Sequence, residues 1–257
     1  MKVRYAIGLG VLAIALGVGI VAIKPPRGLF ALFLISGQVC PGAEYWLEPT
    51  ERVIALTIDD GPDEIRAGPD NTTQQILKVL ADHQSQATFF LISGRITPQS
   101  QPLVAQMVRE GHELGNHLTA DIPSIQRPLK TFAAEVNEAD RAILDAAKAK
   151  TAVNWLRPGG GFCNQQMAEV IQKRHRIALG SIWPYDTLIA SSQFSTWHIL
   201  ANARPGAIIV LHDHGPNGEW GKRTVQTLQR VLPELKRQGY RVTTLSDTSR
   251  AYGYPRP

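Results

Sequence analysis

The sequence predicts an α/β fold built on a parallel sheet or barrel, preceded by an apolar N-terminal segment. Three observations lead to this prediction. From residue 51 onward, short apolar and β-branched runs alternate with amphipathic stretches of helical length, which is typical of parallel sheets. Residues 6–23 form an uncharged run of transmembrane length. The rest of the chain, about 200 residues, is enough for one well-buried α/β domain.

The apolar run at residues 6–23 contains 18 residues, and as a helix it would measure about 27 Å. No small-residue cleavage pattern follows it, so an uncleaved signal anchor is preferred over a cleaved leader. Lys2 and Arg4 slightly outweigh the positive charges after the run, which favours an extracytoplasmic domain by the positive-inside rule. We therefore expect residues 1–27 to anchor the chain in the membrane and residues 28–50 to be a linker.

Seven strands and six helices are expected in the domain, which we assign to residues 51–246. The strand-like runs are residues 53–58, 87–93, 113–116, 154–156, 178–182, 207–211 and 240–245. The helical stretches are residues 71–82, 102–110, 129–149, 164–175, 195–203 and 221–238. Asn71 is a candidate helix cap. Residues 247–257 read as a loose tail.

Charge and cysteine content limit the partners and the compartment. The net charge of +5 is dispersed, which suits a location near anionic envelope polymers or membranes and gives no reason to expect a nucleic-acid partner. Cys40 and Cys163 are the two cysteines. In an exported protein they would form one disulfide, but a free buried thiol at Cys163 is an equally good interpretation.

The most informative motif is the adjacent pair Asp59 and Asp60 at the end of the first strand-like run, followed by Gly61 and Pro62. A strand that feeds into such a turn holds both carboxylates at the carboxyl end of a sheet or barrel, where α/β folds bind ligands. One carboxylate would bind a metal while the other acts as a base. The alternative is an ordinary acidic surface turn.

Three further motifs follow in order. They are Gly-His-Glu-Leu-Gly-Asn-His at residues 111–117, Leu-Arg-Pro-Gly-Gly-Gly at residues 156–161, and Ile-Ile-Val-Leu-His-Asp at residues 208–213. Together with Asp59 and Asp60, this ordered set resembles the polysaccharide deacetylases, carbohydrate esterase family 4. The resemblance covers roughly residues 51–246 and implies a distorted, incomplete (β/α)7-type barrel.

The resemblance also implies one divalent metal, held by Asp60, His117 and Asp121. The family usually supplies a second His where this chain has Asp121, four residues after His117; on one helical turn the two would face the same side. Zinc is the expected metal, although the extra carboxylate shifts the preference towards manganese or another hard ion. A helix or turn cap is the alternative role for Asp121, and a core histidine is the alternative for His117.

The remaining family roles fall on four residues. Asp59 would be the general base and Arg157 the partner that aims it. Gly160 would donate its backbone N–H to the oxyanion, and His212 would be the general acid. Trp183, Tyr185 and Trp220 are candidate walls for a sugar, although aromatic residues at such positions are more often core.

A second departure concerns the partner of His212. In this family an Asp normally orients the catalytic His, but the matching position is Ile189, which cannot form that hydrogen bond. Asp186 would substitute only if the loop shifts. We read Asp213 and His214 as loop residues rather than ligands.

These residues predict a membrane-anchored, extracytoplasmic hydrolase that removes N-acetyl or O-acetyl groups from a polysaccharide such as peptidoglycan or chitin-like oligomers. The competing hypothesis is a catalytically weak or inactive relative that binds acetylated glycan. Asp59, Arg157 and His212 favour the enzyme, whereas Asp121 and Ile189 favour the inactive relative.

Overall fold

A parallel sheet forms the centre of the computed structural model, which describes residues 40–66 and 68–250. The strand order is β1-β6-β5-β4-β3-β2-β7, with β8 also paired to β2. The strands are β1 (Ala43–Glu44), β2 (Val53–Gly61), β3 (Thr88–Leu91), β4 (Glu113–Asn116), β5 (Trp155–Leu156), β6 (Arg176–Ala178), β7 (Ile208–His212) and β8 (Arg241–Thr243). The predicted α/β class with a parallel sheet is confirmed.

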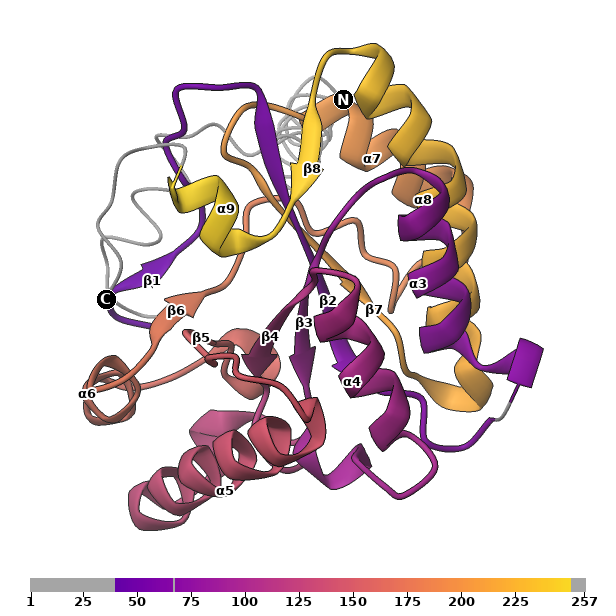
Figure 1. Ribbon diagram of the computed structural model, residues 1–257. Helices are drawn as coiled ribbons and strands as arrows, with labels where there is room; N and C mark the ends of the chain where they lie inside the picture. Colours follow the sequence, from indigo (N-terminus) through magenta and orange to yellow (C-terminus); the bar gives the residue numbers. More distant parts are fainter. Residues whose placement is uncertain (1–39, 67, 251–257) are drawn as a thin grey trace, which may run out of the picture. The chain divides into compact units, whose positions relative to one another are not determined.

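Six of the α-helices surround this sheet in nearly the order of the chain (Figure 1). They are α3 (Thr72–Asp82), α4 (Gln101–Arg109), α5 (Leu129–Ala147), α6 (Gln165–Gln172), α7 (Ser192–Asn202) and α8 (Glu219–Arg237). Contacts link α7 to α8, α8 to α3, α3 to α4, α4 to α5 and α5 to α6. This succession is the outer ring of a (β/α) barrel, in which each helix covers the sheet between neighbouring strands.

The two sides of the sheet meet just beyond β6. Ile182 pairs with Ile209 of β7 in a parallel bridge. The backbone N–H of Ile182 donates to the oxygen of Ile208 at 3.0 Å, and Val210 N–H donates to Ile182 at 3.0 Å. One bridge in place of a full strand pairing closes the barrel unevenly, which agrees with the distorted barrel that was expected.

Strand β2 lies in the middle of the core, and all nine of its residues are buried. Ile54, Leu56 and Ile58 pack in the cluster that also contains the apolar faces of α3 and α8. Burying each such side chain stabilises the fold by roughly 1.5–3 kcal/mol. Because both faces of a parallel strand are covered, the run reads as nearly continuous apolar sequence up to the two aspartates.

The predicted helices are found with shifts of a few residues at their ends. Asn71 caps α3 as expected, since its Oδ1 accepts a hydrogen bond from Gln74 N–H at 3.0 Å. One difference lies at the C-terminus, where α9 (Leu245–Arg250) occupies the start of the expected tail and buries Leu245 and Thr248. A second difference is β1, which pairs with β6 although its residues fall in the expected linker.

Cys40 and Cys163 form a disulfide across 123 residues of sequence. The bond ties the first described residue of the chain to the segment that follows the glycine-rich motif.

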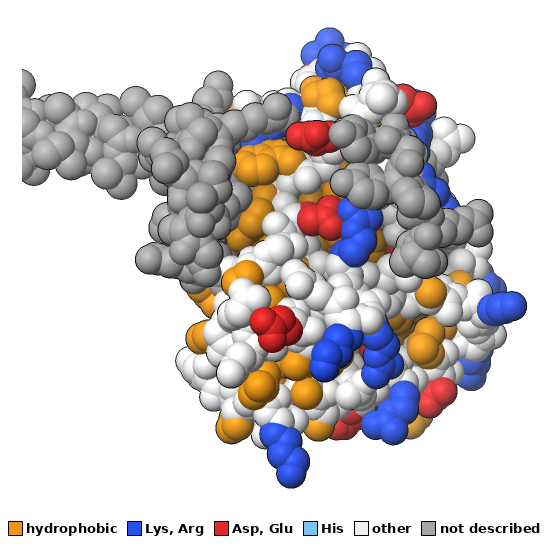
Figure 2. Space-filling view, turned by 90° about the vertical axis from the view of Figure 1, so that its left-hand side faces the viewer, with side chains coloured by type: hydrophobic (Ala, Val, Ile, Leu, Met, Phe, Trp, Pro, Cys, Tyr) orange, Lys and Arg blue, Asp and Glu red, His pale blue; other side chains and the backbone are white. Residues whose placement is uncertain are grey.

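No helix within residues 40–66 and 68–250 has the length and apolar character needed to cross a bilayer. The predicted anchor at residues 1–27 lies outside the described residues. Figure 2 shows Lys and Arg side chains dispersed over one face among acidic and uncharged residues.

Candidate active site

The end of β2 directs both carboxylates of the aspartate pair into one pocket. Asp59 and Asp60 are 3% and 4% exposed. The pairing register between β2 and β3 shifts at this point, and Asp60 has a left-handed φ of 69°. Side chains normally alternate across a strand, but a bulge with positive φ rotates one residue away from that alternation. The irregularity therefore brings two neighbouring carboxylates to the same side.

Arg157 forms a buried ion pair with Asp59. It is 1% exposed, and its Nη1 donates to Asp59 Oδ1 at 2.5 Å and to Thr57 Oγ1 at 2.8 Å. Its Nε donates to the backbone oxygen of Ala178 at 2.8 Å, and the guanidinium lies 4.2 Å from the ring centre of Phe90. These contacts fix the guanidinium from several sides, so the Asp59 carboxylate has one well-defined orientation. The pairing predicted for Arg157 is confirmed by the geometry.

His117 presents its Nε2 atom to Asp60. Its Nδ1 lies 2.6 Å from the backbone oxygen of Arg157, which can only accept, so Nδ1 carries a proton. Nε2 lies 3.4 Å from Asp60 Oδ1. Burial opposes ionisation of Asp60, but His117, His212 and Arg95 outweigh it and lower the Asp60 pKa to about 2. A carboxylate facing an imidazole nitrogen that is oriented in this way is a typical half of a divalent-metal site.

Asp121 lines the same pocket but not on the expected helical turn. Asn116 Oδ1 accepts the N–H of Leu118 at 2.8 Å, and Leu118 has a φ of 67°. This turn breaks the helical path directly after His117, so the prediction that His117 and Asp121 share a helix face is wrong. Asp121 reaches the pocket from an exposed bend instead.

A second set of residues that could bind a metal contains two carboxylates and a histidine. Among the described residues, Asp63, Glu64 and His214 are the one set whose three potential ligand atoms all lie within 4.8 Å of one another. The carboxylate of Asp63, however, already accepts from the side chain of Arg66 at 3.0 Å and from Thr72 N–H at 3.0 Å. A cation bound there would have to displace the guanidinium. We therefore consider Asp60 and His117, with Asp121 beside them, the better fit to a divalent metal.

His212 ends β7 and has the orienting carboxylate that the motif comparison left open. Its Nδ1 lies 3.1 and 3.0 Å from the two carboxylate oxygens of Asp186, and its backbone N–H donates to Asp186 Oδ2 at 3.0 Å. Ile189 is 37% exposed and takes no such role. Asp186 therefore supplies the partner that Ile189 cannot, which is the alternative that the sequence left open.

The charge around His212 favours its protonated form. Burial lowers the pKa of an imidazole, but the carboxylates of Asp186, Asp60 and Asp59 outweigh it and raise the His212 pKa to about 10. Since Nδ1 faces Asp186, Nε2 is the atom left to give a proton towards the pocket. This is the state that a general acid needs.

These residues line one pocket of about 190 Å³. Its walls are Asp59, Asp60, His117, Asp121, Arg157, Pro158, Gly160, Gly161, Trp183, Thr187, His212 and Trp220. Gly160 has a φ of 69°. This backbone conformation favours glycine, so a residue without a side chain occupies this position. Trp183 and Trp220 are walls as expected. Tyr185 is not among them, and its ring packs 5.5 Å from that of His198.

A buried network behind the pocket gave no signal in the sequence analysis. Asp213 is fully buried, and Thr72 and Thr73 at the start of α3 donate their hydroxyls to its two oxygens. Its N–H donates to the oxygen of Asp59 at 2.9 Å. Burial and nearby carboxylates raise the Asp213 pKa to about 6. Asp213 lies in the bend after β7, as expected for a loop residue, and its buried carboxylate and N–H also link β7, β2 and α3.

Comparison with known proteins agrees with this geometry. The sequence profile described as polysaccharide deacetylase matches residues 47–175. A peptidoglycan-N-acetylglucosamine deacetylase from Bacillus cereus is 33% identical over 216 residues, covering 80% of this chain and 92% of that protein. A chitooligosaccharide deacetylase from Rhizobium leguminosarum bv. trifolii is 32% identical over 210 residues, covering 76% of this chain and 91% of that protein.

Solved structures share the fold. The structure of a peptidoglycan N-acetylglucosamine deacetylase superposes with a TM-score of 0.73 at 24% identity, covering 84% of this chain and 95% of that one. A pseudoenzyme of carbohydrate esterase family 4 from Bacillus anthracis superposes with a TM-score of 0.70 at 19% identity, covering 82% of this chain and 70% of that one. At these identities the likeness concerns the fold alone.

Proposed function

Because this chain belongs to the polysaccharide deacetylases, carbohydrate esterase family 4, we propose that it hydrolyses N-acetyl groups of an envelope glycan in a metal-dependent reaction. One observation carries the proposal. A base with its orienting cation, Asp59 and Arg157, and an acid with its orienting anion, His212 and Asp186, line one pocket. An inactive glycan-binding relative would have no need to keep both pairs.

The pair of Asp59 and Arg157 would accept a proton, and the pair of His212 and Asp186 would donate one. Asp59 Oδ1 is engaged by Arg157, so Oδ2 is the atom that would take the proton from the attacking water. The backbone N–H of Gly160 would stabilise the oxyanion that forms from the acetyl carbonyl. His212 Nε2 would then protonate the leaving amine, which completes the release of acetate.

Asp60, His117 and Asp121 would hold the metal. A divalent ion there, zinc or a harder ion such as manganese, would polarise the acetyl carbonyl and make water a better nucleophile. The fit rests on the Nε2 atom of His117, which its Nδ1 contact with Arg157 directs towards Asp60. Two carboxylates and one imidazole form a harder set than the family's usual ligands, which favours oxygen-preferring ions.

The substrate would be a peptidoglycan or chitin-like chain outside the cytoplasm. The names of the relatives support these glycans. The Cys40–Cys163 disulfide supports an oxidising compartment, since such bonds are rare in the cytosol. Membrane attachment through residues 1–27 remains part of the proposal and rests on the sequence.

Acetate release from a panel of polymers tests the proposal. The panel contains N-acetylglucosamine oligomers, peptidoglycan and acetylated xylan, each with zinc or manganese supplied. We expect release from at least one N-acetylated polymer and slower release from the xylan. Binding to these polymers without any acetate release would support the inactive relative instead.

A further inference from the structure

The bend that carries Asp121 is held by the guanidinium of Arg127. Arg127 Nη1 donates to the backbone oxygen of Ile122 at 2.8 Å, and its Nη2 donates to that of Ala120 at 3.2 Å. One guanidinium thus binds the carbonyls on both sides of Asp121. Arg127 is 8% exposed, and its Nε donates to the carboxylate of Glu135 on α5. The backbone around Asp121 is therefore tied to α5 through the Arg127–Glu135 ion pair.

Two glycines approach the same bend closely. The N–H of Gly94, which follows β3, donates to the backbone oxygen of Thr119 at 3.1 Å. A Cβ on Gly94 would lie 2.4 Å from that oxygen, and a Cβ on Gly159 would lie 2.4 Å from the oxygen of Ile122. Only residues without a side chain allow the bend this close to the segments after β3 and β5.

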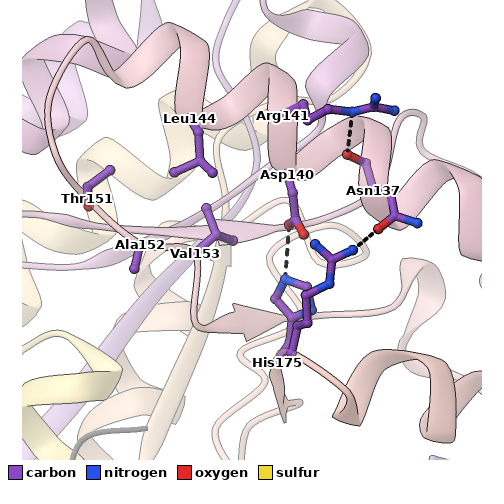
Figure 3. A pocket seen from close by; sticks show the side chains of 9 residues that line it. Asn137, Asp140, Arg141, Leu144, Thr151, Ala152, Val153 and His175 are labelled. Carbon is purple, nitrogen blue, oxygen red and sulfur yellow. Dashed lines mark hydrogen bonds and ion pairs between the residues drawn. The ribbon is translucent and has the colours of Figure 1, made fainter.

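The chain directly before His117 is tied to the same helix. Asn116 is fully buried, and its Nδ2 donates to Asp140 Oδ1 on α5 at 2.7 Å. His175 Nε2 lies 3.0 Å from the same oxygen, which fixes the carboxylate from a second side (Figure 3). Helix α5 therefore anchors the backbone at His117 as it does around Asp121.

The carboxylate of Asp121, in contrast, has no partner among residues 40–66 and 68–250. Its side chain lines the catalytic pocket, and neither a hydrogen bond nor an ion pair joins it to the described part of the chain. A turn cap would accept a backbone N–H through this carboxylate, so the alternative role of Asp121 as a cap is not found. A fixed backbone combined with a free carboxylate is what a metal ligand requires.

We propose that Arg127 is a positioning residue that fixes Asp121 as a ligand of the catalytic metal. This role rests on the metal-dependent function proposed above. A carboxylate on an exposed bend loses conformational entropy when it binds an ion, and a bend whose backbone is already held loses less. Because the Glu135 carboxylate balances the charge of Arg127, the pair adds no net charge and acts on the metal through geometry.

Calorimetric titration of the full, metal-free chain with zinc tests this role. Arg127→Met releases both carbonyls, and we expect zinc to bind at least about tenfold more weakly, as is typical when a partner that orients a ligand is lost. Arg127→Lys keeps the charge and N–H donors but not the planar fork, so it should recover part of the affinity. The matched control is Arg176→Met, which removes a guanidinium from its ion pair with Glu44 outside the pocket and should bind zinc as the unaltered chain does.

A double-mutant cycle separates positioning from general support of the fold. If Arg127 acts through Asp121, Arg127→Met added to Asp121→Ala should weaken zinc binding no further, whereas a merely structural role would give additive losses. Should Arg127→Met fail to fold, Arg127→Lys takes its place in the cycle, with the same lack of additivity expected.

Additive losses, or equal zinc affinities in the unaltered chain and the Arg127 variant, would overturn the positioning role. Acetate release is a separate readout. The expected zinc affinities without any acetate release would support the role of Arg127 and reject deacetylation, so the two failures can be told apart.

Discussion

Two ion pairs of opposite polarity decide which side chain acts as base and which as acid. Arg157 places a cation against Asp59, and Asp186 places an anion against His212. The guanidinium fixes the direction in which the Asp59 carboxylate points, and the neighbouring anion favours an imidazolium that can donate a proton. Each partner therefore supports the role proposed for its catalytic residue.

Asp186→Asn tests the partner of His212. The substitution removes the anion that most raises the His212 pKa, so the imidazolium should lose its proton at lower pH. Because the general acid works only when protonated, the alkaline limb of kcat/KM should move down by about 1–3 pH units. Profiles from pH 6 to 11 would show this, with Ile189→Ala as a control that leaves the limb in place. Identical limbs in the unaltered enzyme and Asp186→Asn would contradict the pairing.

Asp121→Ala tests the third metal ligand. We expect it to weaken binding of zinc or manganese by at least about tenfold, because even outer partners of a metal ligand contribute that much. His214→Ala, in the competing group around Asp63, should leave binding unchanged. Asp121→His should bind zinc more tightly than the unaltered chain, since imidazole is a softer ligand. Full metal occupancy in Asp121→Ala together with loss in His214→Ala would move the site to Asp63.

The sequence could predict residues that sit in contiguous motifs but not those joined only by the fold. Asp59, Arg157 and His212 each follow a recognisable strand, and the structure brings them together. Asp186 was left open because its loop departs from the motif at Ile189. The buried contacts of Asp213 could not be predicted, because its partners Thr72 and Thr73 lie 141 and 140 residues away in the sequence.

At the scale of elements, the end of β2 is held by its neighbours on both sides. Asp213 joins the end of β7 to the first turn of α3 and to the backbone of Asp59. The disulfide joins the start of the described chain to the segment after the glycine-rich motif. Both links connect segments that are far apart in the sequence.

Asp213 should make stability depend on pH. Its folded-state pKa of about 6 is above the ordinary value of 3.8, so its contribution is full below about pH 3.8 and is lost as pH rises through about 6. Asp213→Asn does not titrate. Between pH 4.5 and 7.5 the unaltered chain should therefore lose about 2 kcal/mol more unfolding free energy than the variant. Urea unfolding at both pH values measures this, and equal losses would refute it.

The disulfide should stabilise the fold measurably. Cross-linking two residues separated by 123 positions restricts the unfolded chain, and loops of this length correspond to about 4–5 kcal/mol. Urea unfolding of Cys40→Ser with Cys163→Ser should show a loss of that order. Reductant should destabilise the unaltered chain and have no effect on the double variant. A reductant-insensitive unaltered chain would mean that the bond contributes nothing.

At the scale of the whole molecule, the alternation of strand and helix patterns was enough to predict the fold class. The sequence could not predict how the barrel closes, because the Ile182–Ile209 bridge is a single pairing without a strand pattern of its own. Nor could it predict β1 or α9, which are too short to show a period.

Above all, we propose that the pocket at the end of β2 is a working deacetylase site. The most direct measurement is the initial rate of acetate release from N-acetylglucosamine oligomers by the metal-loaded chain beside Asp59→Asn. We predict turnover by the unaltered chain and a loss of about 10²–10⁴-fold in the variant, with metal binding retained. Equal rates in the two proteins, or no acetate from either while metal is bound, would contradict it.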